Sequence, residues 1–153
     1  MTIKGESSLR KELKKLKFED RPQVVEAIAT AREFGDLKEN AEYHAAKEQQ
    51  SLMEARIKDI EFKLSESQVI DVTKIDPSEK VIFGTTVTIK DMEDSQSIIY
   101  KIVGEDEANA KEGRISVLSP LAKNLIGKFI GDIVKFEAPG GSKEYEIILV
   151  EYI

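Results

Sequence analysis

The sequence predicts an α+β protein, in which an N-terminal antiparallel coiled-coil hairpin of α-helices is followed by a small antiparallel β-sheet domain with one short helix. Apolar residues recur at helical spacings of three and four in the first part of the chain and at a spacing of two in the second. These are the periods of amphipathic helices and strands. We therefore predict a hairpin over residues 1–75, with its tip near residues 35–43, and a sheet domain over residues 76–153.

The first arm of the predicted hairpin starts with an apolar face formed by Leu9, Leu13 and Leu16. Pro22 follows, and because proline has no backbone N–H, we expect a break or kink before it and a new helix from there to about Phe34. One face of that helix should be buried against the second arm. The residues expected on this face are Val24, Val25, Ile28, Ala29 and Ala31.

The second arm is predicted from about Leu37 to Ser67, because its apolar residues follow the spacing of a coiled-coil seam. At ~1.5 Å per residue, an arm of ~30 residues would place the tip ~45 Å from the base of the hairpin. Such a length indicates that the hairpin reaches a distant site. The predicted seam comprises Ala46, Met53, Ile57, Ile60 and Leu64.

Segments rich in β-branched residues follow a linker at residues 69–78 and predict the strands of the sheet. Pro139-Gly140-Gly141-Ser142 predicts a hairpin turn before the last strand. Residues 119–127 predict a short helix, with Ser119 as its cap, Pro120 in its first turn and a glycine after its end. The strand candidates are 81–83, 85–89, 98–103, 115–117, 133–136 and 145–153.

Composition limits the class of protein. The chain has 153 residues, no cysteine and a formal net charge of −6, so disulfides and thiolate metal sites are excluded and a cytoplasmic protein is expected. The negative charge argues against a protein that coats nucleic acid by itself. No run of 18 apolar residues is present, so no membrane span is expected.

Two carboxylates at the predicted tip, Asp36 and Glu39, have two interpretations. Asp36 could cap the second helix and Glu39 could complete a capping box, which is a common structural device at helix starts. Two carboxylates at the end of a long hairpin, followed by an amide and a phenol, are also what a divalent cation and a nucleic-acid 3′ end would need. Both interpretations are compatible with each other.

The stretch from Gly35 to Gln50, GDLKENAEYHAAKEQQ, resembles the tip motif of the bacterial transcript cleavage factors, and specifically of their GreA branch. The resemblance covers essentially the whole chain. Residues 42–46 differ from those of GreB-type members, and inhibitory relatives with an Asp-rich tip fit less well. Further matching segments are residues 56–61, 69–71, 81–84, 119–122 and 125–128.

The resemblance implies a factor that is not itself an enzyme and that binds RNA polymerase as a monomer. Its FKBP-like C-terminal domain would dock at the rim of the secondary channel, with Ser119 and Pro120 in the contact, and the coiled coil would enter the channel. There Asp36 and Glu39 would help to hold a catalytic Mg²⁺ together with acids of the polymerase. The polymerase would then hydrolyse the 3′ end of backtracked RNA, and no metal would bind tightly to this chain alone.

Four further residues near the tip are candidates for contacts with RNA. The Asn40 amide would position water or phosphate, and the Tyr43 ring would stack on an RNA base; the alternative is exposure or packing at the tip. Arg32 and Lys47 would form a small basic patch toward the RNA 3′ segment. Their alternative is a solvated flank paired with neighbouring glutamates. The single histidine, His44, is expected at the surface or in tip packing.

Three other functions remain possible from the sequence: a channel-binding regulator that does not stimulate cleavage, a prolyl isomerase or chaperone on a coiled-coil arm, and an enzyme acting alone. An aromatic-lined proline pocket is not expected, because tryptophan is absent and aromatic residues make up 7% of the chain.

Phe129 and Ile130 replace polar residues expected from the resemblance. They would mark either an adapted contact surface or a buried edge.

Overall fold

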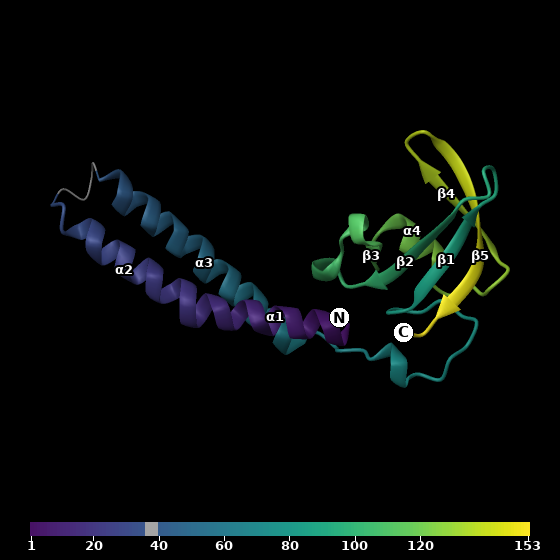
Figure 1. Cartoon of the computed structure of the whole chain (residues 1–153), viewed down its shortest axis with the longest axis horizontal. Coiled ribbons are helices and arrows are strands. Elements are labelled where there is room, and N and C mark those ends of the chain that lie inside the picture. Colours follow the sequence, from purple (N-terminus) through teal and green to yellow (C-terminus); the bar gives the residue numbers. More distant parts are fainter. Residues whose placement is uncertain (36–39) are drawn as a thin grey trace. The chain divides into compact units, whose positions relative to one another are not determined.

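The computed structural model describes residues 1–35 and 40–153, and it divides into two compact units. Residues 6–67 form a helical hairpin, and residues 1–5 together with 68–153 form a unit built on a five-stranded sheet (Figure 1). The predicted fold class, a helical hairpin followed by a small sheet with one short α-helix, is confirmed.

The units differ from the predicted division at residue 75, because both ends of the hairpin segment join the sheet unit. The Met1 carbonyl accepts a hydrogen bond of 2.9 Å from the Ile70 N–H. The buried Thr2 donates its backbone N–H to Glu107 Oε2 at 3.1 Å. Residues 1–5 therefore belong with a part of the chain that lies far away in sequence, which no local pattern indicates.

The first arm is helical throughout and contains no break. Helix α1, Ile3–Lys15, continues through a π-helical turn, Leu16–Asp20, into α2, Arg21–Arg32. In this wider turn the Arg21 N–H donates to the Leu16 carbonyl, five residues back. Pro22 has no N–H to donate, and a proline ring clashes with the carbonyl four residues earlier in a regular α-helix. The π-helical turn accommodates the proline without ending the helix.

The hairpin is held by a narrow apolar seam between α2 and α3, Ala41–Glu66. Val25 and Ala29 were expected in the seam and are exposed, Val25 by 53%. Each follows a seam residue by one position, which turns it by about 100° around the helix and away from the partner helix. The buried residues are Val24, Ile28 and Ala31 from α2 with Ala46, Met53, Ile57 and Ile60 from α3, whereas the predicted Leu64 is half-buried.

Ion pairs flank the seam and join the two arms. Arg21 donates two hydrogen bonds to Glu54, at 2.8 and 2.9 Å. Arg56 makes the same two-pronged contact with Glu12, at 2.7 and 2.9 Å. Planar guanidinium–carboxylate pairs of this kind favour one relative position of the two partners. They therefore help to set the register of the first arm against α3, with Arg21 from α2 and Glu12 from α1.

The hydrogen bonds from Arg21 hold the pKa of the Glu54 carboxyl below its usual range. Because the pKa is lower in the folded state, this carboxylate stabilises the fold above its unfolded-state pKa, and the contribution is lost as pH falls through the folded value. Arg21→Gln is expected to raise the titration midpoint of Glu54, measured by NMR of the carboxyl carbon. Lys14→Gln, which removes an exposed cation elsewhere, is the control. An unchanged midpoint in Arg21→Gln would show that the pair does not form in solution.

The second unit is a five-stranded sheet in the order β3-β2-β1-β5-β4, with every pair antiparallel except the parallel pair β2 and β3. The turn Pro139-Gly140 connects β4 to β5 as predicted, with Gly141 at a φ of +122°. Three short 3₁₀ helices, Val72–Lys74, Glu105–Glu107 and Ala110–Glu112, lie outside the sheet. The strands are β1 Thr86–Asp91, β2 Ser97–Val103, β3 Arg114–Ser116, β4 Ile133–Ala138 and β5 Gly141–Glu151.

The predicted strand at residues 81–83 is absent from the sheet. Val81 is fully buried and exchanges backbone hydrogen bonds with the segment after α4, Pro120–Leu125. Its N–H donates to the Lys128 carbonyl at 2.8 Å, and its carbonyl accepts from the Gly127 N–H at 2.9 Å. The apolar pattern of this segment thus reflects burial in the core and not membership of a strand.

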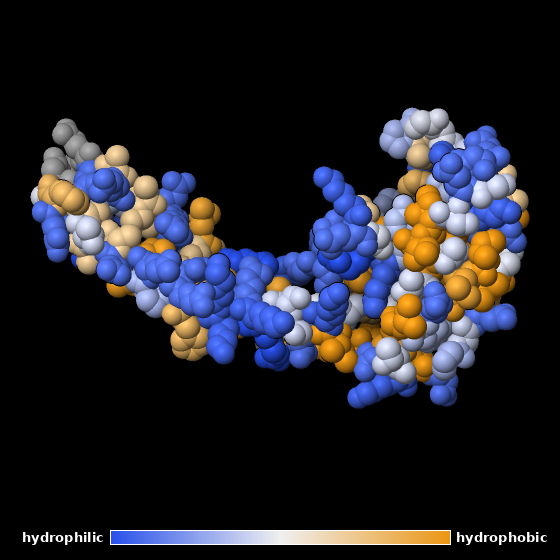
Figure 2. Space-filling view, viewed as in Figure 1, coloured by the Kyte–Doolittle hydropathy of each residue, from blue (hydrophilic) through white to orange (hydrophobic). Residues whose placement is uncertain are grey.

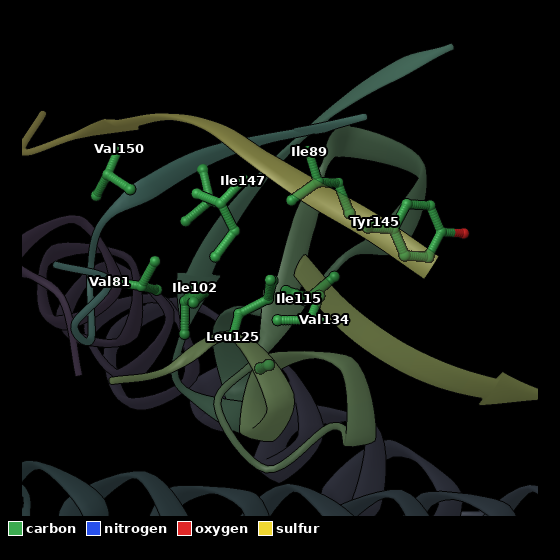
Figure 3. Packing of buried hydrophobic residues seen from close by; sticks show 11 residues of the cluster. Val81, Ile89, Ile102, Ile115, Leu125, Val134, Tyr145, Ile147 and Val150 are labelled. Atoms are coloured by element: carbon green, nitrogen blue, oxygen red, sulfur yellow. The ribbon is translucent and has the colours of Figure 1, made fainter. Parts of the chain in front are cut away.

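The core of the second unit lies between one face of the sheet and α4. Figure 3 shows Ile147 of β5 pointing toward Ile102 and Leu125, with Tyr145 at the edge of the same cluster. Ile147 and Leu125 are both fully buried. Of the two residues that depart from the resemblance, Ile130 packs against this cluster while Phe129 remains 48% exposed.

Several apolar side chains of the strands are exposed to solvent, and Figure 2 shows hydrophobic areas on this unit. A β-bulge shifts the register of β1 against β5 between Thr88 and Ile89. Ile148 and Leu149 follow the buried Ile147 and are 42% and 43% exposed.

Within the described residues, no helix is both long and apolar enough to cross a membrane.

Candidate functional site at the hairpin tip

Helix α3 starts later than predicted, and its cap is a different residue. The helix begins at Ala41, and Asn40 has the extended backbone of a cap, with φ −82° and ψ 99°. Its Oδ1 accepts a hydrogen bond of 3.1 Å from the Tyr43 N–H. The prediction that Asp36 caps the second helix is therefore wrong, because Asn40 occupies that position. Asp36 and Glu39 themselves lie outside the described residues.

Asn40 also connects α3 to the other arm. Its Nδ2 donates a hydrogen bond of 2.7 Å to the carbonyl of Ala31, near the end of α2. Ala31 is 2% exposed and belongs to the buried stripe of α2. Both polar atoms of the Asn40 amide thus have a partner within the protein. The sequence-based prediction was instead that this amide contacts water or phosphate.

Tyr43 lies beside Arg32 and against the hairpin seam. The Arg32 guanidinium carbon is 5.9 Å from the centre of the Tyr43 ring, within the range of a cation–π contact. The ring is half-buried against the seam cluster and meets His44 edge-on, with centroids 5.6 Å apart. Packing at the tip was one of the two interpretations of Tyr43, and the ring still has an exposed part.

Arg32 and Lys47 are both exposed, on opposite arms. Lys47 lies one helical turn beyond Tyr43 and contacts Gln50, with Nζ 3.3 Å from Oε1. Among the described residues, Arg32 contacts the Tyr43 ring and Lys47 contacts Gln50. The expected alternative was an ion pair of each cation with the neighbouring Glu33 or Glu48. Both cations are thus exposed near the tip of the hairpin.

The chemistry of the tip fits a divalent cation only in part. Magnesium in proteins is commonly held by one or two carboxylates and keeps several waters, which agrees with a pair such as Asp36 and Glu39. Among the described residues, no group of three or more metal-binding side chains could hold an ion. Two carboxylates by themselves leave most coordination positions of a Mg²⁺ ion to waters or to ligands from elsewhere.

Ser119 and Pro120, the predicted docking residues, begin α4. The Ser119 Oγ accepts from the Ala122 N–H at 3.3 Å and donates to the Ser116 carbonyl at 2.7 Å. Pro120 is exposed, and Leu118 beside it is 56% exposed. Ser119 thus shapes the turn, while Pro120 and Leu118 present an apolar surface to solvent.

Two family models match almost the entire chain. One, described as "Transcription elongation factor, N-terminal", matches residues 1–69, and the other, "Transcription elongation factor, GreA/GreB, C-term", matches residues 76–152. The chain belongs to the GreA/GreB family of transcription elongation factors. The family expected from the tip motif is confirmed, and a role in transcription elongation follows from it.

Relatives within the GreA/GreB family support the GreA branch. Proteins named transcription elongation factor GreA from Thioalkalivibrio sulfidiphilus and Vibrio parahaemolyticus are 59% and 60% identical to this chain, over all of it and 97% of their own length.

Two solved structures from this family are similar to the chain. The GreA factor homolog 1 of Thermus thermophilus has a TM-score of 0.42 and 23% identity, over 99% of this chain and 97% of that one. A GreA/GreB factor from Nitrosomonas europaea has a TM-score of 0.46 and 26% identity, over 63% of this chain and 79% of that one.

The role of Ala31 in the site was missed from the sequence. Ala31 was placed in the seam, but its carbonyl is a backbone group, and no side-chain pattern marks it as the partner of Asn40. The signal that could have indicated the contact is the amide at position 40, since asparagine is a preferred helix cap.

Proposed function

We propose that this GreA/GreB family member binds bacterial RNA polymerase as a monomer and inserts its hairpin into the secondary channel. There it stimulates the polymerase's own Mg²⁺-dependent cleavage of the 3′ end of backtracked RNA, so that arrested complexes resume elongation. The observation that supports this proposal most directly is the cap of α3. Asn40 provides it, so the carboxylates of Asp36 and Glu39 are not required for that cap.

The tip residues would divide the chemistry between them. When bound, Mg²⁺ activates a water and stabilises the leaving oxygen in phosphodiester hydrolysis. Asp36 and Glu39 would hold the ion jointly with acids of the polymerase. Arg32 and Lys47 would hold phosphates of the extruded RNA, and the exposed part of the Tyr43 ring would stack on a base.

The test uses RNA polymerase complexes stalled in a backtracked state. Adding the protein with Mg²⁺ is expected to release short 3′ fragments and to restore elongation, while the protein with Mg²⁺ and free RNA should release nothing. Binding to the polymerase without cleavage would favour a channel-binding regulator. Cleavage of free RNA would favour an enzyme acting alone. Robust prolyl isomerisation that survives removal of the hairpin, residues 6–67, would favour the isomerase.

Docking through the start of α4 predicts a separate effect on binding. Pro120→Glu places a charge on the exposed first turn of α4, where a carboxylate is compatible with the helix. The half-saturating concentration in the cleavage assay is expected to rise by about tenfold, the loss of roughly 1.4 kcal/mol of binding, with the same maximal rate. Pro77→Glu, at an exposed proline of the linker, is the control. Equal half-saturation for both variants would remove Pro120 from the docking surface.

A further inference from the structure

Two contacts join the last turn of α2 to the first turn of α3. Asn40 connects to the Ala31 carbonyl at 2.7 Å and to the Tyr43 N–H at 3.1 Å. The Arg32 guanidinium lies 5.9 Å from the centre of the Tyr43 ring. We refer to Ala31, Arg32, Asn40 and Tyr43 as the tip brace. These residues enclose the part of the sequence that contains Asp36 and Glu39.

The amide of Asn40 suits both of its partners at once. The end of α2 presents a carbonyl, which needs a donor, and the start of α3 presents an N–H group, which needs an acceptor. A primary amide offers an NH₂ donor and a carbonyl acceptor on the same carbon. Because Ala31 supplies only an acceptor and Tyr43 only a donor, just one orientation of the amide satisfies both bonds.

Aspartate at position 40 would keep one bond and lose the other. Its carboxylate would still accept from the Tyr43 N–H, because aspartate is as good a helix cap as asparagine. It has no proton to donate to the Ala31 carbonyl, and the C-terminal end of α2 disfavours a negative charge. Serine would likewise keep the cap, but its short hydroxyl would not span both partners. These substitutions separate the connection between the arms from the cap.

We propose that Asn40 is a positioning residue for transcript cleavage. By fixing the end of α2 to the start of α3, it keeps the backbone before Asp36 and the backbone after Glu39 at one distance from each other. This inference rests on the proposed function. A pair of carboxylates holds one ion in a productive geometry more readily when the backbone around them is held in place. Asn40 therefore acts through the tip acids and does not touch the RNA.

The first experiment measures the brace in the free protein. The chain contains no cysteine, so Glu33→Cys with Glu42→Cys gives two spin labels at exposed positions on opposite sides of the tip. Continuous-wave EPR is expected to show one narrow distance distribution, which becomes broader when Asn40→Asp is added. Gln49→Glu, which adds the same charge at an exposed site of α3, is the matched control and should leave the distribution narrow.

The second experiment is the cleavage assay on stalled complexes. Asn40→Asp and Asn40→Ser are expected to lower the maximal cleavage rate by about tenfold or more, the effect of misplacing catalytic groups. The half-saturating concentration should stay within about twofold, since the docking surface is unchanged. Helix content, measured by circular dichroism, should remain that of the wild type. A direct contact of Asn40 with RNA would lower the rate without broadening the EPR distribution.

The outcomes separate this inference from the proposed function. If Asn40→Asp broadens the EPR distance distribution and the wild type fails to stimulate cleavage, the proposed function is wrong. If the wild type stimulates cleavage and Asn40→Asp leaves either the distances or the maximal rate unchanged, the positioning role is overturned. Broader distances together with a lower maximal rate would establish it.

Discussion

Asp36→Asn and Glu39→Gln are each expected to lower the maximal rate of stimulated cleavage by on the order of 100-fold, the size of effect seen when one group that stabilises developing charge is removed. Each replacement keeps the shape of the side chain and removes its negative charge. Because the acids are proposed to act only at the reaction centre, the half-saturating concentration of the protein should not change.

The control for these variants is Glu42→Gln, an exposed acid in the first turn of α3. It makes the same chemical change close to the tip and is expected to retain the wild-type cleavage rate. Raising the Mg²⁺ concentration should partly restore Glu39→Gln, because a site that loses one ligand binds its ion more weakly. Tip variants that cleave as fast as Glu42→Gln would show that the acids do not hold the catalytic ion.

Elements with a strong period were predicted well, because burial of one face determines both the pattern and the structure. Ala46, Met53, Ile57 and Ile60 follow the coiled-coil spacing, and all four are buried. Val25 shows the limit of the same argument. A helix with a single partner buries only a narrow stripe, so an apolar residue beside the stripe remains in solvent.

Features that depend on contacts between distant residues could not be predicted. The pairing of residues 1–5 with the sheet unit depends on Glu107 and Ile70, and nothing near the start of the sequence indicates those partners. The cap of α3 shows the same limit at shorter range. Asp36 and Asn40 are both good caps by residue type, so residue type does not decide between them; the structure has Asn40 as the cap, with a further contact to Ala31 across the hairpin.

The core of the sheet unit predicts the largest effect on stability. Ile147→Ala is expected to lower the free energy of unfolding of this unit by about 2–5 kcal/mol, through lost burial and the cavity left behind. Ile147 is fully buried, while the next residue along β5, Ile148, is 42% exposed. Ile148→Ala removes the same atoms from a partly solvated position and should cost about 1 kcal/mol or less. The two variants therefore differ in burial alone.

Urea unfolding followed by tyrosine fluorescence measures this difference. The chain has four tyrosines and no tryptophan, and three of the tyrosines, Tyr100, Tyr145 and Tyr152, lie in the sheet unit, so the signal reports mainly on that unit. If docking to the polymerase depends on the folded sheet unit, Ile147→Ala should also raise the half-saturating concentration for cleavage near its unfolding midpoint, while Ile148→Ala should not. Equal unfolding midpoints for the two variants would show that β5 does not pack into the core as described, because only burial distinguishes them.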